Sequence, residues 1–104
     1  MPVTEITDAL YTIKEYDGGS KIRFNRGTPQ KVTLLKSSDN SCRLGPGTVI
    51  EVQQIGAGKV TFAGARGVTI NSRGGLLSLN GQYAAGTLMC DGVDTWTLSG
   101  DIAA

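Results

Sequence analysis

The chain contains no histidine, and this absence excludes several kinds of chemistry at once. Histidine is the commonest general base and metal ligand, so Ser-His-Asp and Cys-His catalytic arrangements cannot form within the chain. The two cysteines, Cys42 and Cys90, lack the paired spacing of a zinc site and are too few for a disulfide framework. We expect both thiols to be reduced, with Cys90 on the inner face of a strand, and we expect no catalytic residue, metal or cofactor.

Long apolar runs and clusters of basic residues are also missing. No stretch approaches the length that spans a bilayer, and the N-terminus has no basic region followed by an apolar segment. The ten Lys and Arg residues are scattered and nearly balanced by nine Asp and Glu residues, which gives a formal charge of +1. Nucleic-acid-binding domains usually carry a basic stripe instead. The sequence therefore predicts neither a membrane partner nor a nucleic-acid partner.

One glycine-rich segment, Gly56-Ala57-Gly58-Lys59, has the appearance of the end of a phosphate-binding loop. That motif needs a glycine where Gln53 stands and a Ser or Thr where Val60 stands, and it must open a helix. Here the segment joins two strand-like stretches. It is predicted to be a turn.

Carboxylates and tyrosines offer few further sites. Three carboxylates gather near the C-terminus, but each lies beside a glycine or a turn, and turn chemistry accounts for them better than a metal or sugar site does; they are Asp91, Asp94 and Asp101. The three tyrosines have two interpretations, as groups that stack on sugars or anchor an interface, and as ordinary residues of a sheet surface; they are Tyr11, Tyr16 and Tyr83.

The stretch from Gly47 to Ile70 carries the clearest structural pattern. Apolar residues alternate with polar ones on both sides of the Gly56–Gly58 break, with Ile50 and Val52 before it and Val60 and Phe62 after it. A period of two places one face of each segment in a core. The pattern predicts two strands joined by a tight hairpin and a third strand from Val68, which together form a β-meander.

The remainder of the chain consists of similar short segments separated by turn signals, with no helical periodicity and no internal repeat. A polar loop occupies residues 37–47. The side chains expected to point inward are Ile22, Phe24, Ala84, Gly86, Leu88, Cys90, Trp96 and Leu98. Short strands at regular spacing predict an all-β fold, a single-domain, antiparallel, jelly-roll-like β-sandwich over residues 10–104, preceded by an N-terminal arm at residues 1–9.

Several of these segments together resemble a module of tailed-bacteriophage virion proteins. The resemblance rests on residues 47–62, on Gly67–Ser72, on Gly81-Gln82-Tyr83 and on the ending Asp94–Ile102, with its Trp-x-Leu-x-Gly-Asp sequence. It covers roughly residues 10–102 and is most like a small capsid cement, or decoration, protein. The Cys42 loop is unusually polar for the module, and the chain has no long N-terminal anchor of the kind that attaches fibres.

The resemblance implies a non-enzymatic structural protein on the outer surface of a phage head, assembled in the host cytoplasm. Its partners would be the major capsid protein, whose capsomers it bridges, and two further copies of itself in a homotrimer. Two alternatives remain: a receptor- or glycan-binding module of a tail fibre or tailspike, and a small carbohydrate-binding domain of a lytic enzyme. The arm carries more apolar side chains than a free tail would, so the expected interface consists of Pro2, Val3, Ile6, Leu10, Tyr11 and Tyr16.

Overall fold

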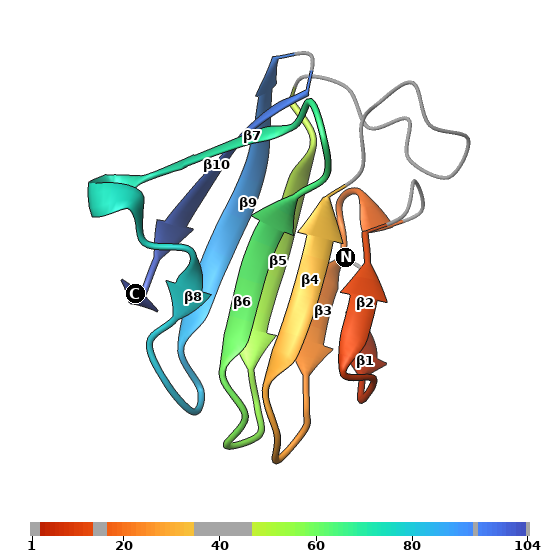
Figure 1. Ribbon diagram of the computed structural model, residues 1–104. Helices are drawn as coiled ribbons and strands as arrows, with labels where there is room; N and C mark the ends of the chain where they lie inside the picture. The colour runs from red at the N-terminus through yellow and green to blue at the C-terminus, as the bar shows by residue number, and fades with distance from the viewer. Residues whose placement is uncertain (1–2, 14–16, 35–46, 93, 104) are drawn as a thin grey trace.

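The computed structural model describes residues 3–13, 17–34, 47–92 and 94–103. These residues form two facing β-sheets and one short 3₁₀ turn, η2 (Arg73–Gly75) (Figure 1). The first sheet, sheet A, contains in spatial order β1 (Val3–Ile6), β3 (Lys21–Phe24), β5 (Val49–Gln54), β9 (Ala85–Gly92), β10 (Thr95–Gly100) and β7 (Thr69–Ser72). The second, sheet B, contains β11 (Ile102–Ala103), β8 (Ser78–Leu79), β6 (Val60–Gly64), β4 (Gln30–Leu34) and β2 (Leu10–Thr12).

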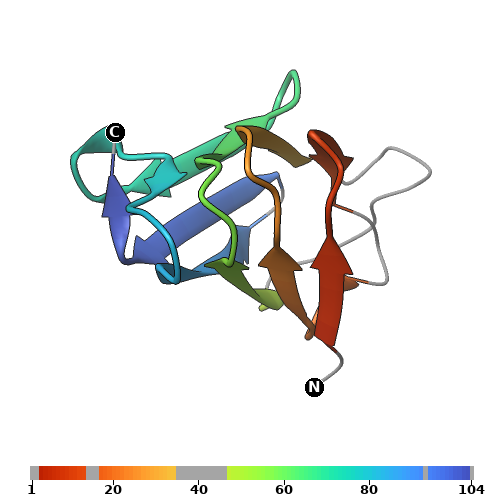
Figure 2. The same cartoon turned by 90° about the horizontal axis from the view of Figure 1, so that it is seen from below.

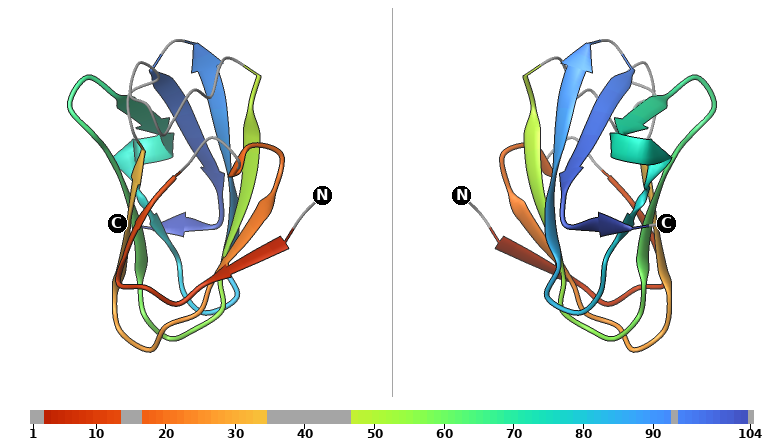
Figure 3. Two further views of the ribbon diagram at one scale, coloured as in Figure 1. Left: turned by 90° about the vertical axis from the view of Figure 1, so that its right-hand side faces the viewer. Right: turned by 90° about the vertical axis from the view of Figure 1, so that its left-hand side faces the viewer.

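The prediction of an all-β sandwich in one domain is confirmed. Figure 3 shows the two layers edge-on, and the inward side chains of both sheets meet between them. Every residue that alternation placed inside is buried, including Trp96 at 2% exposure and Cys90 at 1%. Three aromatic rings cross the core in edge-to-face contacts: Tyr11 on Phe24 and Phe24 on Phe62, each pair with centroids 6.2 Å apart.

The expected antiparallel, jelly-roll-like pairing is wrong for much of the molecule. Among the described strands, β1 with β3, β3 with β5, β2 with β4, β4 with β6 and β7 with β10 are parallel. Antiparallel pairing is confined to β5 with β9, β9 with β10, β6 with β8 and β8 with β11. A jelly roll is built from antiparallel Greek keys, so the first half of this chain follows a different plan.

That plan is a repeated crossing from one sheet to the other. Successive strands β1 to β6 alternate between sheets A and B, so neighbours within a sheet are two strands apart in sequence and run the same way (Figure 1). The predicted hairpin at Gly56–Gly58 is therefore an arch, because β5 lies in sheet A and β6 in sheet B. The meander prediction is wrong for the same reason. Alternation shows which side chains face inward, but not which strand is the neighbour.

The second and third arches stack with one offset in both sheets, although the sequence shows no repeat. Lys21 pairs with Glu51 in sheet A and Gln30 pairs with Val60 in sheet B, both thirty positions apart. The segment 21–34, with its arch, therefore lies directly beside the segment 51–64. The two segments form a spatial repeat, similar to the coils of a β-solenoid, in which each unit contacts only its neighbours.

Buried glutamines hold the arches closed from inside. Gln54, 2% exposed, accepts a hydrogen bond from the Val60 N–H through Oε1 (3.3 Å) and donates from Nε2 to the Gly56 carbonyl (3.1 Å). Gln30, 3% exposed, donates from Nε2 to the carbonyls of Ile6 and Asp8 in the first arch. A buried amide is costly unless it is paired, so Gln54 specifies the turn of backbone that it bonds on both sides, whereas Gln30 is paired through Nε2 and its Oε1 has no partner among the described residues.

Residues 1–9 do not form a separate arm over their described part. Val3–Ile6 is the edge strand β1, and its last residue, Ile6, is half-buried against the core. The chain from Val3 to Thr12 is thus the first rung of the stack, with β1 in sheet A, β2 in sheet B and an arch between them. The first rung is part of the sandwich.

We predict that Gly58→Ala destabilises the protein and that Gly27→Ala does not. An added Cβ at Gly58 would collide with the Thr28 carbonyl of the adjacent arch, whereas a Cβ at Gly27 has open space around it. Overpacking of this kind costs about 1–3 kcal/mol, and surface changes cost less than about 0.5 kcal/mol. Urea unfolding of the two variants measures the difference. Equal stabilities would contradict the stacked arches and favour a hairpin.

Candidate functional site

The first rung presents two exposed aliphatic side chains. Val3 on β1 is 61% exposed and Leu10 on β2 is 74% exposed; the other exposed large hydrophobic residues of the described chain are Tyr83 and Met89. β1 and β2 are the last described strands of their sheets at this end of the molecule (Figure 2). Edge strands offer unpaired backbone groups to another chain, and apolar side chains on them increase that tendency.

Val3 and Leu10 point to opposite outer faces of the sandwich. Along β1 exposure alternates, so that Val3 and Glu5 point outward from sheet A while Thr4 and Ile6 are half-buried. In β2, Leu10 points outward from sheet B and the next residue is buried. A single flat partner cannot cover both outer faces of a sandwich. The rung therefore offers two separate contact surfaces.

Of the other residues predicted for the interface, Tyr11 belongs to the core. It is 9% exposed, and its hydroxyl donates a hydrogen bond of 2.8 Å to Oδ2 of the buried Asp17. We therefore remove it from the contact surface. Ile6 lies at the margin of the core, half-buried. Pro2 and Tyr16 lie outside the described residues.

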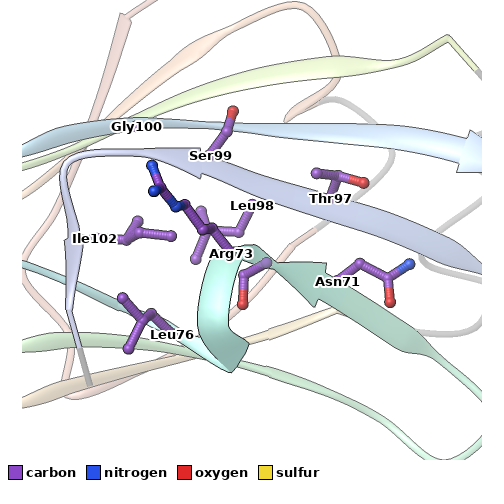
Figure 4. Close-up of a pocket in the computed structure, with 9 residues that line it drawn as sticks. Asn71, Arg73, Leu76, Thr97, Leu98, Ser99, Gly100 and Ile102 are labelled. Carbon is purple, nitrogen blue, oxygen red and sulfur yellow. The ribbon is translucent and has the colours of Figure 1, made fainter.

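The opposite end of the sandwich has a pocket of about 700 Å³. It lies where β7, η2, β10 and β11 come together, at the far edges of the same two sheets (Figure 4). Its apolar side consists of Leu76, Leu98 and Ile102, and its polar side of Asn71, Ser72, Arg73, Thr97 and Ser99. The sequence analysis did not predict this pocket. The only signal was an arginine within the glycine-rich break after Ser72.

Two polar groups give the pocket its chemistry. Ser72 Oγ is buried, and no hydrogen-bond partner lies within reach among the described residues. Arg73 is exposed and supplies the only charge among the lining residues; its side chain extends from η2 toward β10 in Figure 4. A buried hydroxyl without a partner is costly, and a guanidinium pairs well with a carboxylate. The pocket suits an aliphatic group with an acidic group beside it.

A third feature is Tyr83, which is 63% exposed and has φ of 67°. The left-handed region is unfavourable for a bulky residue, and it persists only where the surroundings impose it. Here the Tyr83 N–H donates to the Gln54 carbonyl, and Gln53 Nε2 donates to the Tyr83 carbonyl (3.2 Å). The backbone is held on both sides while the ring points outward. Such a fixed aromatic ring is a suitable platform for stacking.

The C-terminal carboxylates are not brought together. Asp91 lies near the end of β9 and Asp94 in the turn before β10, whereas Asp101 follows the far end of β10. Asp91 accepts a hydrogen bond from the Thr97 hydroxyl, and Asp101 accepts one from Asn80 Nδ2 (3.1 Å). No group of three or more potential metal ligands occurs in the described part of the chain.

Two further expectations concern the cysteines and membranes. Cys90 is shielded as predicted, and its thiol lies 3.2 Å from the Gly92 carbonyl. Cys42 lies outside the described residues, so its environment stays a prediction. Within the described ranges, no helix has the length and apolar character needed to cross a membrane.

Comparison of the chain with protein-family models, with curated proteins and with solved structures found no match. The features that bear on function are therefore those of this chain alone. They are the exposed first rung, the pocket at the opposite end and the Tyr83 loop.

We predict that Tyr83→Asn leaves stability unchanged or raises it by up to about 1 kcal/mol. Asparagine tolerates the left-handed conformation better than tyrosine does, and the exposed ring has few packing contacts to lose. Thermal unfolding monitored by circular dichroism provides the measurement. The control is Tyr83→Val, which should destabilise because a β-branched residue is least tolerated at positive φ. A large loss of stability in the Asn variant would mean that the ring supports the fold.

Proposed function

We propose that this chain is a non-enzymatic structural protein of a phage virion, a cement protein that binds the outer surface of the head as a trimer and bridges capsomers. The sequence resemblance described above suggests the setting. The observation that carries the proposal is the first rung, where Val3 and Leu10 are exposed on the outer faces of opposite sheets. A cement protein needs two kinds of contact, one with the shell and one with its own copies, and this rung offers two.

Leu10 is the side chain that we assign to the shell. It is the most exposed large hydrophobic residue of the described chain, at 74%, and it lies on an edge strand. Burial of an aliphatic side chain contributes about 1.5–3 kcal/mol, and a cement protein repeats this contribution over many sites. The stacked arches present it on a rigid scaffold, so little conformational entropy is lost on binding.

The test measures binding of the purified protein to shells that lack it. Leu10→Asp should weaken binding about tenfold or more, since it replaces an aliphatic contact with a charge that must be desolvated. Met89→Asp is the matched control, because Met89 is also exposed, at 43%. It lies on β9, a strand in the middle of sheet A and away from its edges. Equal binding by the two variants would contradict the assignment of Leu10. Failure of the wild-type protein to bind shells would overturn the proposed function.

The alternative, a receptor- or glycan-binding module of a tail fibre or tailspike, is favoured by the Tyr83 loop. An exposed ring on a constrained backbone is the kind of surface on which a sugar ring stacks, and the Gln82 side chain lies exposed beside it. Under this alternative the wild-type protein should bind host-surface glycans on an array, and Tyr83→Asn should abolish the binding while the fold persists. Glycan binding without shell binding would replace the cement function with this one.

A further inference from the structure

The two ends of the sandwich have complementary properties. At one end, β1 is the last described strand of sheet A, and its outer face carries Val3 and Glu5. At the other end, β7 is the last strand of the same sheet, and the pocket beside it combines an apolar wall with Arg73. Figure 1 shows β1 and β2 on one side of the molecule and β7 and η2 on the other. Neither end can reach the other within one chain.

We propose that the pocket receives β1 of a second copy of this chain, so that copies associate head to tail. Val3 of the second copy packs on Leu76, Leu98 and Ile102. Glu5 of the second copy pairs with Arg73. The proposal deepens the proposed function, because it rests on the trimer expected there and assigns the contact that builds it.

Spacing supports the simultaneous fit of both side chains. Val3 and Glu5 are two residues apart on one face of a strand, which separates them by about 6.8 Å. The pocket, at about 700 Å³, has room for both, and its lining supplies apolar side chains as well as Arg73. A carboxylate there would meet Arg73, the only charged group in the lining.

The arrangement of the sheet edges also supports a head-to-tail contact. Sheet A ends in β1 and β7, and sheet B ends in β2 and β11, so that a head-to-tail contact brings matching sheet edges of two copies together. Such a contact covers edges that would otherwise invite uncontrolled pairing. Because the two surfaces differ, the interface is heterologous, and copies that associate through it either close into a ring or extend as a filament. A three-membered ring is the form that a trimeric cement protein requires.

The test uses charge reversal on the full chain without shells. Sedimentation should show that the wild-type protein associates to three times its 10.9 kDa chain mass. Glu5→Arg and Arg73→Glu should each weaken association about tenfold, since each places like charges opposite one another. The double variant Glu5→Arg/Arg73→Glu should recover most of the loss. Lys31→Glu is the control, because Lys31 is exposed but lies on β4, which is not an edge strand of sheet B. The Lys31→Glu protein should associate as the wild-type protein does.

A mixing experiment separates this interface from a symmetric one. The Glu5→Arg protein keeps an intact pocket, and the Arg73→Glu protein keeps an intact β1, so an equimolar mixture should associate more strongly than either variant alone. No gain on mixing and no rescue in the double variant would overturn the proposal. So would a wild-type protein that stays monomeric at every concentration. Shell binding is measured separately: a monomer that still binds shells through Leu10 would leave the cement function standing without its trimer and without this interface.

Discussion

The close contact between neighbouring arches is the constraint on which the rest of the structure depends. Gly56 and Gly58 lie against the backbone of Arg26 and Thr28, with no room for a side chain between them. That contact sets the thirty-residue offset, and the offset places every inward side chain of β5 and β6 beside its counterpart on β3 and β4. Packing in the core and pairing in both sheets therefore follow from one backbone approach.

Burial could be predicted from the sequence because it needs only alternation. Phe24, Phe62 and Trp96 are buried, and this could be predicted without knowing which strands are neighbours. A period of two identifies the inward face of a strand in any sheet. Strand direction could not be predicted, because hairpins and arches are both signalled by glycine between alternating segments. The spatial repeat was equally hidden. Stacking requires small residues at Gly56 and Gly58 and a hydrogen-bonding side chain at Gln54, and none of these has to recur thirty residues earlier.

The surface features differ in how far the sequence reveals them. Val3 and Leu10, which are exposed, are two of the six residues that the sequence suggested for an interface, and the interface itself stays a prediction. Tyr11, in the same segment, was misplaced because its burial depends on Phe24, a tertiary neighbour. The pocket was missed because its lining comes from two stretches, 71–76 and 97–102, that lie far apart along the chain. Local patterns report local geometry, and a pocket between elements has no local pattern.

The stack of arches is terminated at one end only. After β6 the chain changes plan: β9 pairs antiparallel with β5 and β8 pairs antiparallel with β6, so no further parallel rung can be added on that side. On the other side the first rung ends the described sheets without such a change. A molecule with one terminated end and one continuing end has a direction along the stack, and a head-to-tail contact keeps that direction from one copy to the next. A first rung paired with a second first rung across a two-fold axis would close the assembly at two copies, whereas the head-to-tail contact proposed above leaves one first rung open until a ring closes.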